Sequence, residues 1–96
     1  MKTINVYAAI IGGGAAGLFC AAATKINNGL ILEKTSAPGR KLLMAGSGQC
    51  NLTHGGDIKD FINHYGEHGK KVRSPLYKVS NLKMMDFFES HGIPLI

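Results

Sequence analysis

The sequence predicts an α/β fold built on a parallel βαβ unit, and three features near its start indicate this. They are an apolar run over residues 4–11, a glycine-rich turn over residues 12–17, and a second apolar run over residues 30–32. A near-continuous apolar run rich in β-branched residues is typical of a parallel strand buried on both faces. The intervening segment, Ala15 to Ile26, contains small and apolar residues without proline, which favours a helix packed closely on the sheet.

The end of this helix is predicted at Asn27, Asn28 and Gly29, because Asn and Gly accept the left-handed conformation that often follows a helix. Leu30 to Leu32 are then expected to form the second strand. Residues 34–56 lose any hydrophobic period and gain glycines, although Lys41 to Ala45 are expected to form a helical turn. A glycine-rich connection of this length is uncommon unless it binds something.

Further short helices are expected beyond this connection. Asp57 is expected to cap one with Phe61 and Ile62 on a single face, and Ser74-Pro75 to open another. Ser80 is expected to cap a final helix that ends at Gly92. No internal repeat or linker divides the sequence, so residues 1–96 are interpreted as one incomplete domain without a second.

Composition indicates a folded protein with a modest core. The chain has 96 residues, of which 45% are hydrophobic and 18% charged, and its formal net charge is +5. A nucleic-acid partner is not expected, because the one dense basic cluster, Lys70, Lys71 and Arg73, has only Tyr65 and Tyr77 nearby, and such clusters are usually solvated. An anionic cofactor accounts for the charge equally well.

A cytoplasmic protein is expected. The apolar run over residues 4–11 is too short to cross a membrane, which takes about 20 residues. Cys20 and Cys50 lack metal-ligand spacing and fit free thiols in a reducing compartment, with Cys20 in the core of its helix. No metal site is expected among the histidines either, because no acidic residue stands at ligand spacing from any pair of His54, His64, His68 and His91.

The glycine-rich turn carries the strongest functional signal. It reads GGGAAG, which matches G-x-G-x-x-G, and lies directly between a buried strand and a helix. The first glycine of the motif permits a tight turn, the second lets a pyrophosphate approach the backbone, and the third lets the helix lie close to the strand. The helix N-terminus then offers amides to the phosphates. The residues expected at the diphosphate are Gly12, Gly14, Ala15, Ala16 and Gly17.

Glu33 closes the second strand, 21 positions after Gly12. An acid at about this spacing hydrogen-bonds the ribose hydroxyls of a dinucleotide and repels a 2′-phosphate. FAD or NAD is therefore favoured over NADP, and the alternative is that the glycines only form a turn while Glu33 is a surface acid. The turn itself does not separate FAD from NAD.

Two further segments carry a family resemblance: PGRKLL at residues 38–43 and GSGQCNLT at residues 46–53. Together with IIGGGAAGL and Leu32-Glu33-Lys34, they make the chain resemble bacterial NAD(P)/FAD-dependent oxidoreductases, including aminoacetone-oxidase-like and bile-acid-reductase-like members. The resemblance extends to the Phe87 to Gly92 region, although members of the family are several times longer.

The resemblance implies that this chain is the amino-terminal part of an FAD-binding domain in a flavoprotein with two dinucleotide folds. It places Lys34 beside the adenosine and assigns Arg40 and Lys41 to a GRK element. A second element would pass beside the flavin or its diphosphate; its residues are Gly46, Gly48, Cys50 and Asn51. Gln49 stands where relatives often have Arg, and without a nearby second cysteine Cys50 is interpreted as a packing or flavin-proximal residue.

The expected function is therefore that of an FAD-binding segment of a flavin-dependent oxidoreductase, in which the flavin carries hydride or electrons. NAD(P)H is a candidate electron donor for the full-length protein. No catalytic residue is assigned, and the small-molecule substrate is unknown. Two alternatives are kept: a NAD-binding dehydrogenase or nucleotide-sensing module, and a non-catalytic truncated fragment that associates through an open sheet edge.

Overall fold

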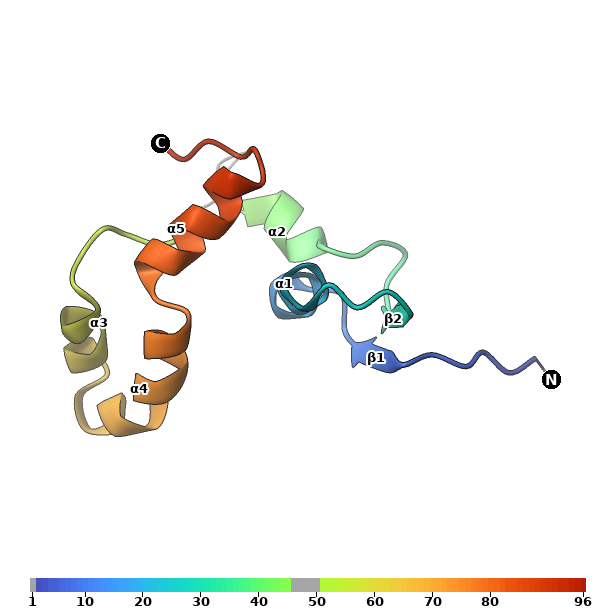
Figure 1. Cartoon of the computed structure of the whole chain (residues 1–96), viewed down its shortest axis with the longest axis horizontal. Coiled ribbons are helices and arrows are strands. Elements are labelled where there is room, and N and C mark those ends of the chain that lie inside the picture. Colours follow the sequence, from blue (N-terminus) through green and yellow to red (C-terminus); the bar gives the residue numbers. More distant parts are fainter. Residues whose placement is uncertain (1, 46–50) are drawn as a thin grey trace. The chain divides into compact units, whose positions relative to one another are not determined.

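The computed structural model describes residues 2–45 and 51–96. The chain divides into two compact units, Met1–Cys50 and Asn51–Ile96, which we call the βαβ unit and the helical unit (Figure 1). Each unit is described by itself. Among the described residues, no helix is both long and apolar enough to span a membrane.

The βαβ unit contains two parallel strands joined through a helix, as predicted. Its elements are β1 (Ala8–Ile11), α1 (Ala15–Thr24), β2 (Gly29–Leu32) and α2 (Arg40–Met44). In the parallel ladder Ala8 is paired with Gly29 and Ile11 with Leu32. The carboxyl ends of both strands therefore meet at one edge of the sheet, beside the glycine turn that opens α1.

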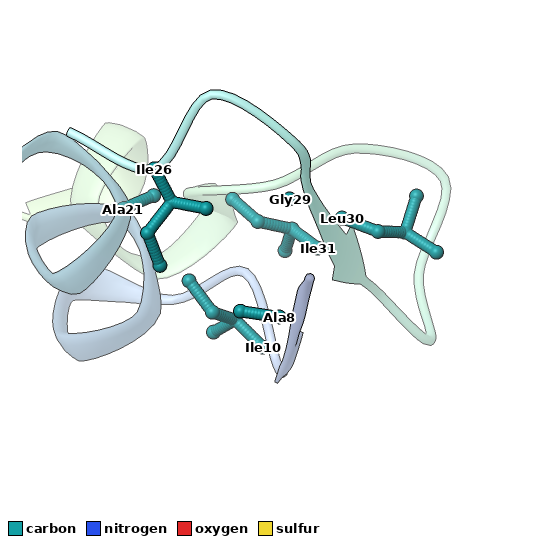
Figure 2. A pocket seen from close by; sticks show the side chains of 7 residues that line it. All are labelled: Ala8, Ile10, Ala21, Ile26, Gly29, Leu30 and Ile31. Atoms are coloured by element: carbon teal, nitrogen blue, oxygen red, sulfur yellow. The ribbon is translucent and has the colours of Figure 1, made fainter. Parts of the chain in front are cut away.

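The two faces of this small sheet differ in whether a helix packs on them. Figure 2 shows Ile10 and Ile31 pointing toward the side of the sheet on which Ala21 and Ile26 lie, around a hollow of about 150 Å³. Ile11, on the opposite face, is 80% exposed. A strand pair that is apolar on both faces is typical of a sheet covered by helices on both sides, and among the described residues of the βαβ unit α1 packs on one side.

The first strand is shorter than predicted. It begins at Ala8 rather than Ile4, which is 68% exposed. The amide of Tyr7 donates a hydrogen bond of 2.9 Å to the carbonyl oxygen of Asn28, where the ladder ends. Because β2 begins at Gly29, the earlier residues have no strand to pair with, and apolar composition alone does not hold them in the sheet.

The end of α1 also differs from the prediction. The helix ends at Thr24, and Lys25 has the left-handed conformation with φ 52° that was expected of Asn27 to Gly29. The left-handed Lys25 turns the chain out of the helix, and the half-buried Ile26 then lines the hollow beside the sheet. Cys20 is exposed rather than in the helix core, because successive helical residues are turned by about 100° and Ala21 takes the sheet-facing position.

The helical unit consists of α3 (Ile58–His64), a 3₁₀ turn η2 (Gly66–His68), α4 (Gly69–Lys78) and α5 (Asn81–Ser90). Both predicted caps are confirmed. Asp57 Oδ1 accepts a hydrogen bond from the Lys59 amide at 2.8 Å, and Ser80 Oγ accepts one from the Lys83 amide at 3.3 Å. After α5 the chain turns at Gly92, which has φ 84°.

The prediction that Ser74-Pro75 opens a helix is wrong, because both residues lie inside α4. The helix begins six residues before Pro75, at Gly69, where a Cβ would lie 2.9 Å from the carbonyl oxygen of Ile62. Val72 and Leu76 lie four residues apart and are both half-buried. Covering this apolar face offsets the hydrogen bond that a proline inside a helix cannot donate.

Candidate functional site

The glycine turn has the conformation that the motif predicts. Gly12 has φ 100°, which favours glycine, and its amide donates a hydrogen bond of 2.8 Å to the carbonyl oxygen of Leu32. A Cβ at Gly17 would collide with the carbonyl oxygen of Gly12 and lie 3.3 Å from Ile10 Cγ2. These two glycines therefore form the turn and bring α1 close to β1; their contact with a diphosphate stays a prediction.

The N-terminus of α1 is open among the described residues. Gly14 is the N-cap residue, no side chain caps the helix, and its first turn carries no acidic residue. A Cβ at Gly14 would meet nothing within 4 Å, and Ala15 and Ala16 are exposed. Uncapped amides at a helix N-terminus carry a partial positive charge, so the geometry suits an anionic group.

Gly13, which the motif leaves unspecified, is also restricted by its neighbours. It is buried, and a Cβ there would lie 2.9 Å from Pro38 Cβ and 3.2 Å from Glu33 Oε1. Its carbonyl oxygen accepts a hydrogen bond of 2.7 Å from the amide of Gly39. The contacts of Gly13 with Glu33 and Gly39 were not predicted from the sequence. The only sign of them there is a glycine at a position where the motif allows any residue.

Glu33 directly follows β2 and its carboxylate lies against the glycine turn. Oε1 accepts a hydrogen bond of 2.9 Å from the Gly13 amide. Oε2 accepts hydrogen bonds from Thr35, from the amide at 2.7 Å and from the hydroxyl at 2.5 Å. Thr35 was not predicted as a site residue, since a threonine two positions after an acid carries no recognisable signal.

These contacts lower the pKa of Glu33 below its ordinary value. The hydroxyl of Thr35 contributes most, followed by the amides of Thr35 and Gly13, and the guanidinium of Arg40 adds a smaller electrostatic effect. Partial burial acts in the opposite direction. Glu33 is therefore an ionised acceptor at neutral pH, as binding of sugar hydroxyls requires.

A cavity of about 420 Å³ joins the open helix end to Glu33. Of the predicted site residues, Gly14, Ala15, Glu33, Arg40 and Lys41 line it, and so do several that were not predicted. The latter are Gly13, Thr35, Ala37, Gly39, Leu42 and Ala45. The two basic residues, Arg40 and Lys41, belong to α2, and both are exposed.

Other predicted site residues are placed elsewhere. Lys34 is exposed and does not line this cavity, and neither do Gly12, Ala16 and Gly17. Gly46, Gly48 and Cys50 lie outside the described residues. Asn51 is exposed at the start of the helical unit and belongs to no helix or strand. Over residues 2–45 and 51–96, no three His, Cys, Asp or Glu side chains gather as metal ligands would.

The family model described as the HI0933-like protein Rossmann domain matches residues 6–96. The chain belongs to this family. The match agrees with the parallel βαβ unit and confirms the resemblance to NAD(P)/FAD-dependent oxidoreductases at the level of the family.

Curated relatives carry two different names. The chain is 35% identical over 88 residues to the 3-dehydro-bile acid delta(4,6)-reductase of Clostridium scindens, covering 88% of the chain. It is 35% identical over 95 residues to the ribosomal RNA dihydrouridine synthase of Escherichia coli, covering 90% of the chain. A protein of the latter name from Haemophilus influenzae is 36% identical over 87 residues, covering 88% of the chain. The chain spans only about a fifth of the length of these relatives, between 21% and 22%.

Proposed function

We propose that this chain supplies the part of an FAD-dependent oxidoreductase that binds the adenosine diphosphate end of FAD. The observation that carries the proposal is the cavity that joins the uncapped start of α1 to the ionised Glu33. The backbone amides of Ala15 and Ala16, at the start of α1, would donate hydrogen bonds to the diphosphate, and the Glu33 carboxylate would accept them from the ribose hydroxyls. The isoalloxazine ring of a bound flavin supplies hydride transfer.

The residues that line the cavity fit such a ligand in charge and in shape. Space is open at the Cβ position of Gly14, so backbone and phosphate can approach closely there. Arg40 and Lys41 place positive charge on the cavity wall, which suits a diphosphate. A 2′-phosphate would instead meet the Glu33 carboxylate, which favours FAD or NAD over NADP.

The reaction class is proposed from the names of the relatives. A delta(4,6)-reductase and a dihydrouridine synthase differ in substrate, but both names describe addition of hydrogen to a carbon–carbon double bond. We therefore infer that the complete protein reduces a carbon–carbon double bond, with hydride from the flavin and a proton from a donor group. No residue described here is assigned as that donor.

A NAD-binding module remains the second candidate, because the same turn and acid also suit NAD. Titration of the chain with FAD, NAD and NADP, followed by thermal shift, separates the two. We expect FAD to raise the unfolding midpoint most and NADP least. Stabilisation by NAD alone would favour the module, and no stabilisation by any of the three would contradict both.

A matched pair of glycine variants tests whether binding occurs at the turn. Gly14→Ala fills the open space in the cavity, whereas Gly55→Ala fills similarly open space in the helical unit. We expect Gly14→Ala to weaken FAD binding at least tenfold, because the added methyl group stands where the diphosphate would lie. Gly55→Ala should bind as the unaltered chain does; equal loss in both would remove the turn as the site.

The isolated chain is expected to hold FAD weakly, because a fifth of a protein supplies few of the contacts that a complete cofactor site makes. A yellow, stoichiometric complex that survives gel filtration would contradict this. A chimera in which the chain replaces the matching segment of the Clostridium scindens relative tests whether the chain can supply its part of a flavin site. We expect it to bind flavin and to lose it on Gly14→Ala.

A further inference from the structure

Three hydrogen bonds link the end of β2 to the glycine turn through one side chain. Thr35 donates its amide and its hydroxyl to Oε2 of Glu33, and Oε1 of the same carboxylate accepts from the Gly13 amide. The carboxylate is thus held at both oxygens. Its position is fixed by backbone on one side and by Thr35 on the other.

The Thr35 hydroxyl has one hydrogen and two acceptors within reach. It lies 2.5 Å from Glu33 Oε2 and 2.9 Å from the carbonyl oxygen of Ala37. Hydrogen bonds to an ionised acceptor are shorter and about twice as strong as those to a neutral one. The hydrogen is therefore directed mainly to Glu33, and the carbonyl oxygen of Ala37 competes for it as a weaker, neutral acceptor.

The two peptide groups that flank the Cα atom of Gly13 each make a hydrogen bond. The Gly13 amide, in the peptide group shared with Gly12, donates to Glu33, and the Gly13 carbonyl oxygen, in the peptide group shared with Gly14, accepts from the Gly39 amide at 2.7 Å. Gly13 is also buried, so these two peptide groups have little room to rotate. Since Gly14 is the next residue and the N-cap of α1, the carboxylate position helps to set the direction of the amides that follow.

We propose that Thr35 is a positioning residue of the dinucleotide site, whose hydroxyl holds Glu33 against the Gly13 amide and keeps the glycine turn ready for the adenosine end of its ligand. The inference rests on the proposed function for the identity of that ligand. The arrangement is compatible with ribose binding. A carboxylate has about four acceptor positions, and the three hydrogen bonds leave one on Oε1 for a sugar hydroxyl.

The first test needs no ligand. The Gly13 amide is observed by NMR in the whole 96-residue chain while the pH is lowered, so that its chemical shift follows protonation of Glu33. In Thr35→Val we expect the midpoint of this titration to rise, because the hydroxyl that favours the carboxylate is gone; Arg40, the charged neighbour, is unchanged. Thr35→Ser should restore the original midpoint.

The second test measures FAD affinity of the same variants. We expect Thr35→Val to weaken binding about three- to tenfold and Thr35→Ser to bind within about twofold of the original chain. Thr24→Val is the matched control, since the Thr24 hydroxyl donates to the Cys20 carbonyl oxygen at 2.6 Å inside α1. Thr24→Val also removes a threonine hydroxyl from the βαβ unit, but the hydrogen bond that it removes makes no contact with the glycine turn.

The outcomes separate this inference from the proposed function. If the original chain binds no FAD, the proposed function fails, while the Gly13 titration still decides the role of Thr35. An unchanged midpoint in Thr35→Val would overturn the inference, as would equal losses of affinity in Thr35→Val and Thr24→Val. If Thr35→Val did not fold, failure of Thr35→Ser to keep the original midpoint would overturn it instead.

Discussion

The side-chain amide of Asn81 donates hydrogen bonds to the carbonyl oxygens of both His54 and Gly56, at 2.9 and 2.8 Å. Asn81 opens α5 and is only 6% exposed. A residue at the start of one helix thus fixes a loop more than twenty positions earlier in the chain. In this loop the ring of His54 stacks on Phe61 of α3, with 4.3 Å between ring centroids.

Replacement of Asn81 by alanine should destabilise the helical unit. Two partly buried hydrogen bonds would be lost, and each contributes about 1 kcal/mol, so we expect about 2 kcal/mol in total. Hydrogen exchange of the α5 amides measures the effect. Asn63→Ala, at an exposed position of α3, is the control; similar exchange in both variants would show that the loop is held by other contacts.

The third glycine of the motif, Gly17, is required for the close packing of the helix on the turn. Gly17→Ala places a methyl group against the Gly12 carbonyl oxygen, so the helix or the turn must move, at a cost of about 1–3 kcal/mol. Gly14→Ala should leave stability within about 0.5 kcal/mol, since its space is open. Urea unfolding of the two variants tests this difference, and a reversed order would contradict the geometry of the turn.

The ionised Glu33 should make the βαβ unit less stable in acid. Because its pKa is lower in the folded chain than its ordinary value of 4.5, its contribution is present above that value and is lost as the pH falls through the folded pKa. We expect the unfolding midpoint to drop as the pH falls below about 4.5. Glu33→Gln should show a smaller drop over this range; identical profiles would argue against the contacts to Thr35 and Gly13.

The uncovered face and edges of the two-stranded sheet should promote self-association. Ile11 is 80% and Leu32 49% exposed, and they are paired across the strands. We expect the double variant Ile11→Thr with Leu32→Thr to lower the average mass measured by light scattering, because threonine keeps strand propensity without the apolar surface. Ile10→Thr, on the face toward α1, should unfold the unit instead. A monomeric original chain would contradict the prediction.

Much of the βαβ unit could be predicted because its signals are local. The turn at Gly12, the helix that begins at Ala15 and the acid after β2 are each specified by residue type at a fixed spacing. The length of β1 was not predictable in this way. It depends on the partner strand, and the short ladder from Gly29 leaves Ile4 without a partner.

The site was predicted in part for the same reason. Glu33 and Gly14 follow from the motif, but the contacts of Gly13 and Thr35 arise only when residues 33–39 fold back over the turn. Likewise, the preference of proline for the first position of a helix predicts a helix that starts at Pro75. The helix instead continues through Pro75, where Val72 and Leu76 on one face are half-buried. Tertiary contacts of this kind leave little trace in composition or spacing.

The parallel pairing of β1 with β2 has a consequence for synthesis on the ribosome. Each residue of β1 meets a partner 21 positions later, so the ladder closes only after the whole crossover has emerged. The α3 and α4 helices join residues much nearer in sequence and can form faster. The nascent strand pair exposes the apolar side chains of Ile11 and Leu32, and we expect this surface to be open to chaperones that bind apolar segments during translation.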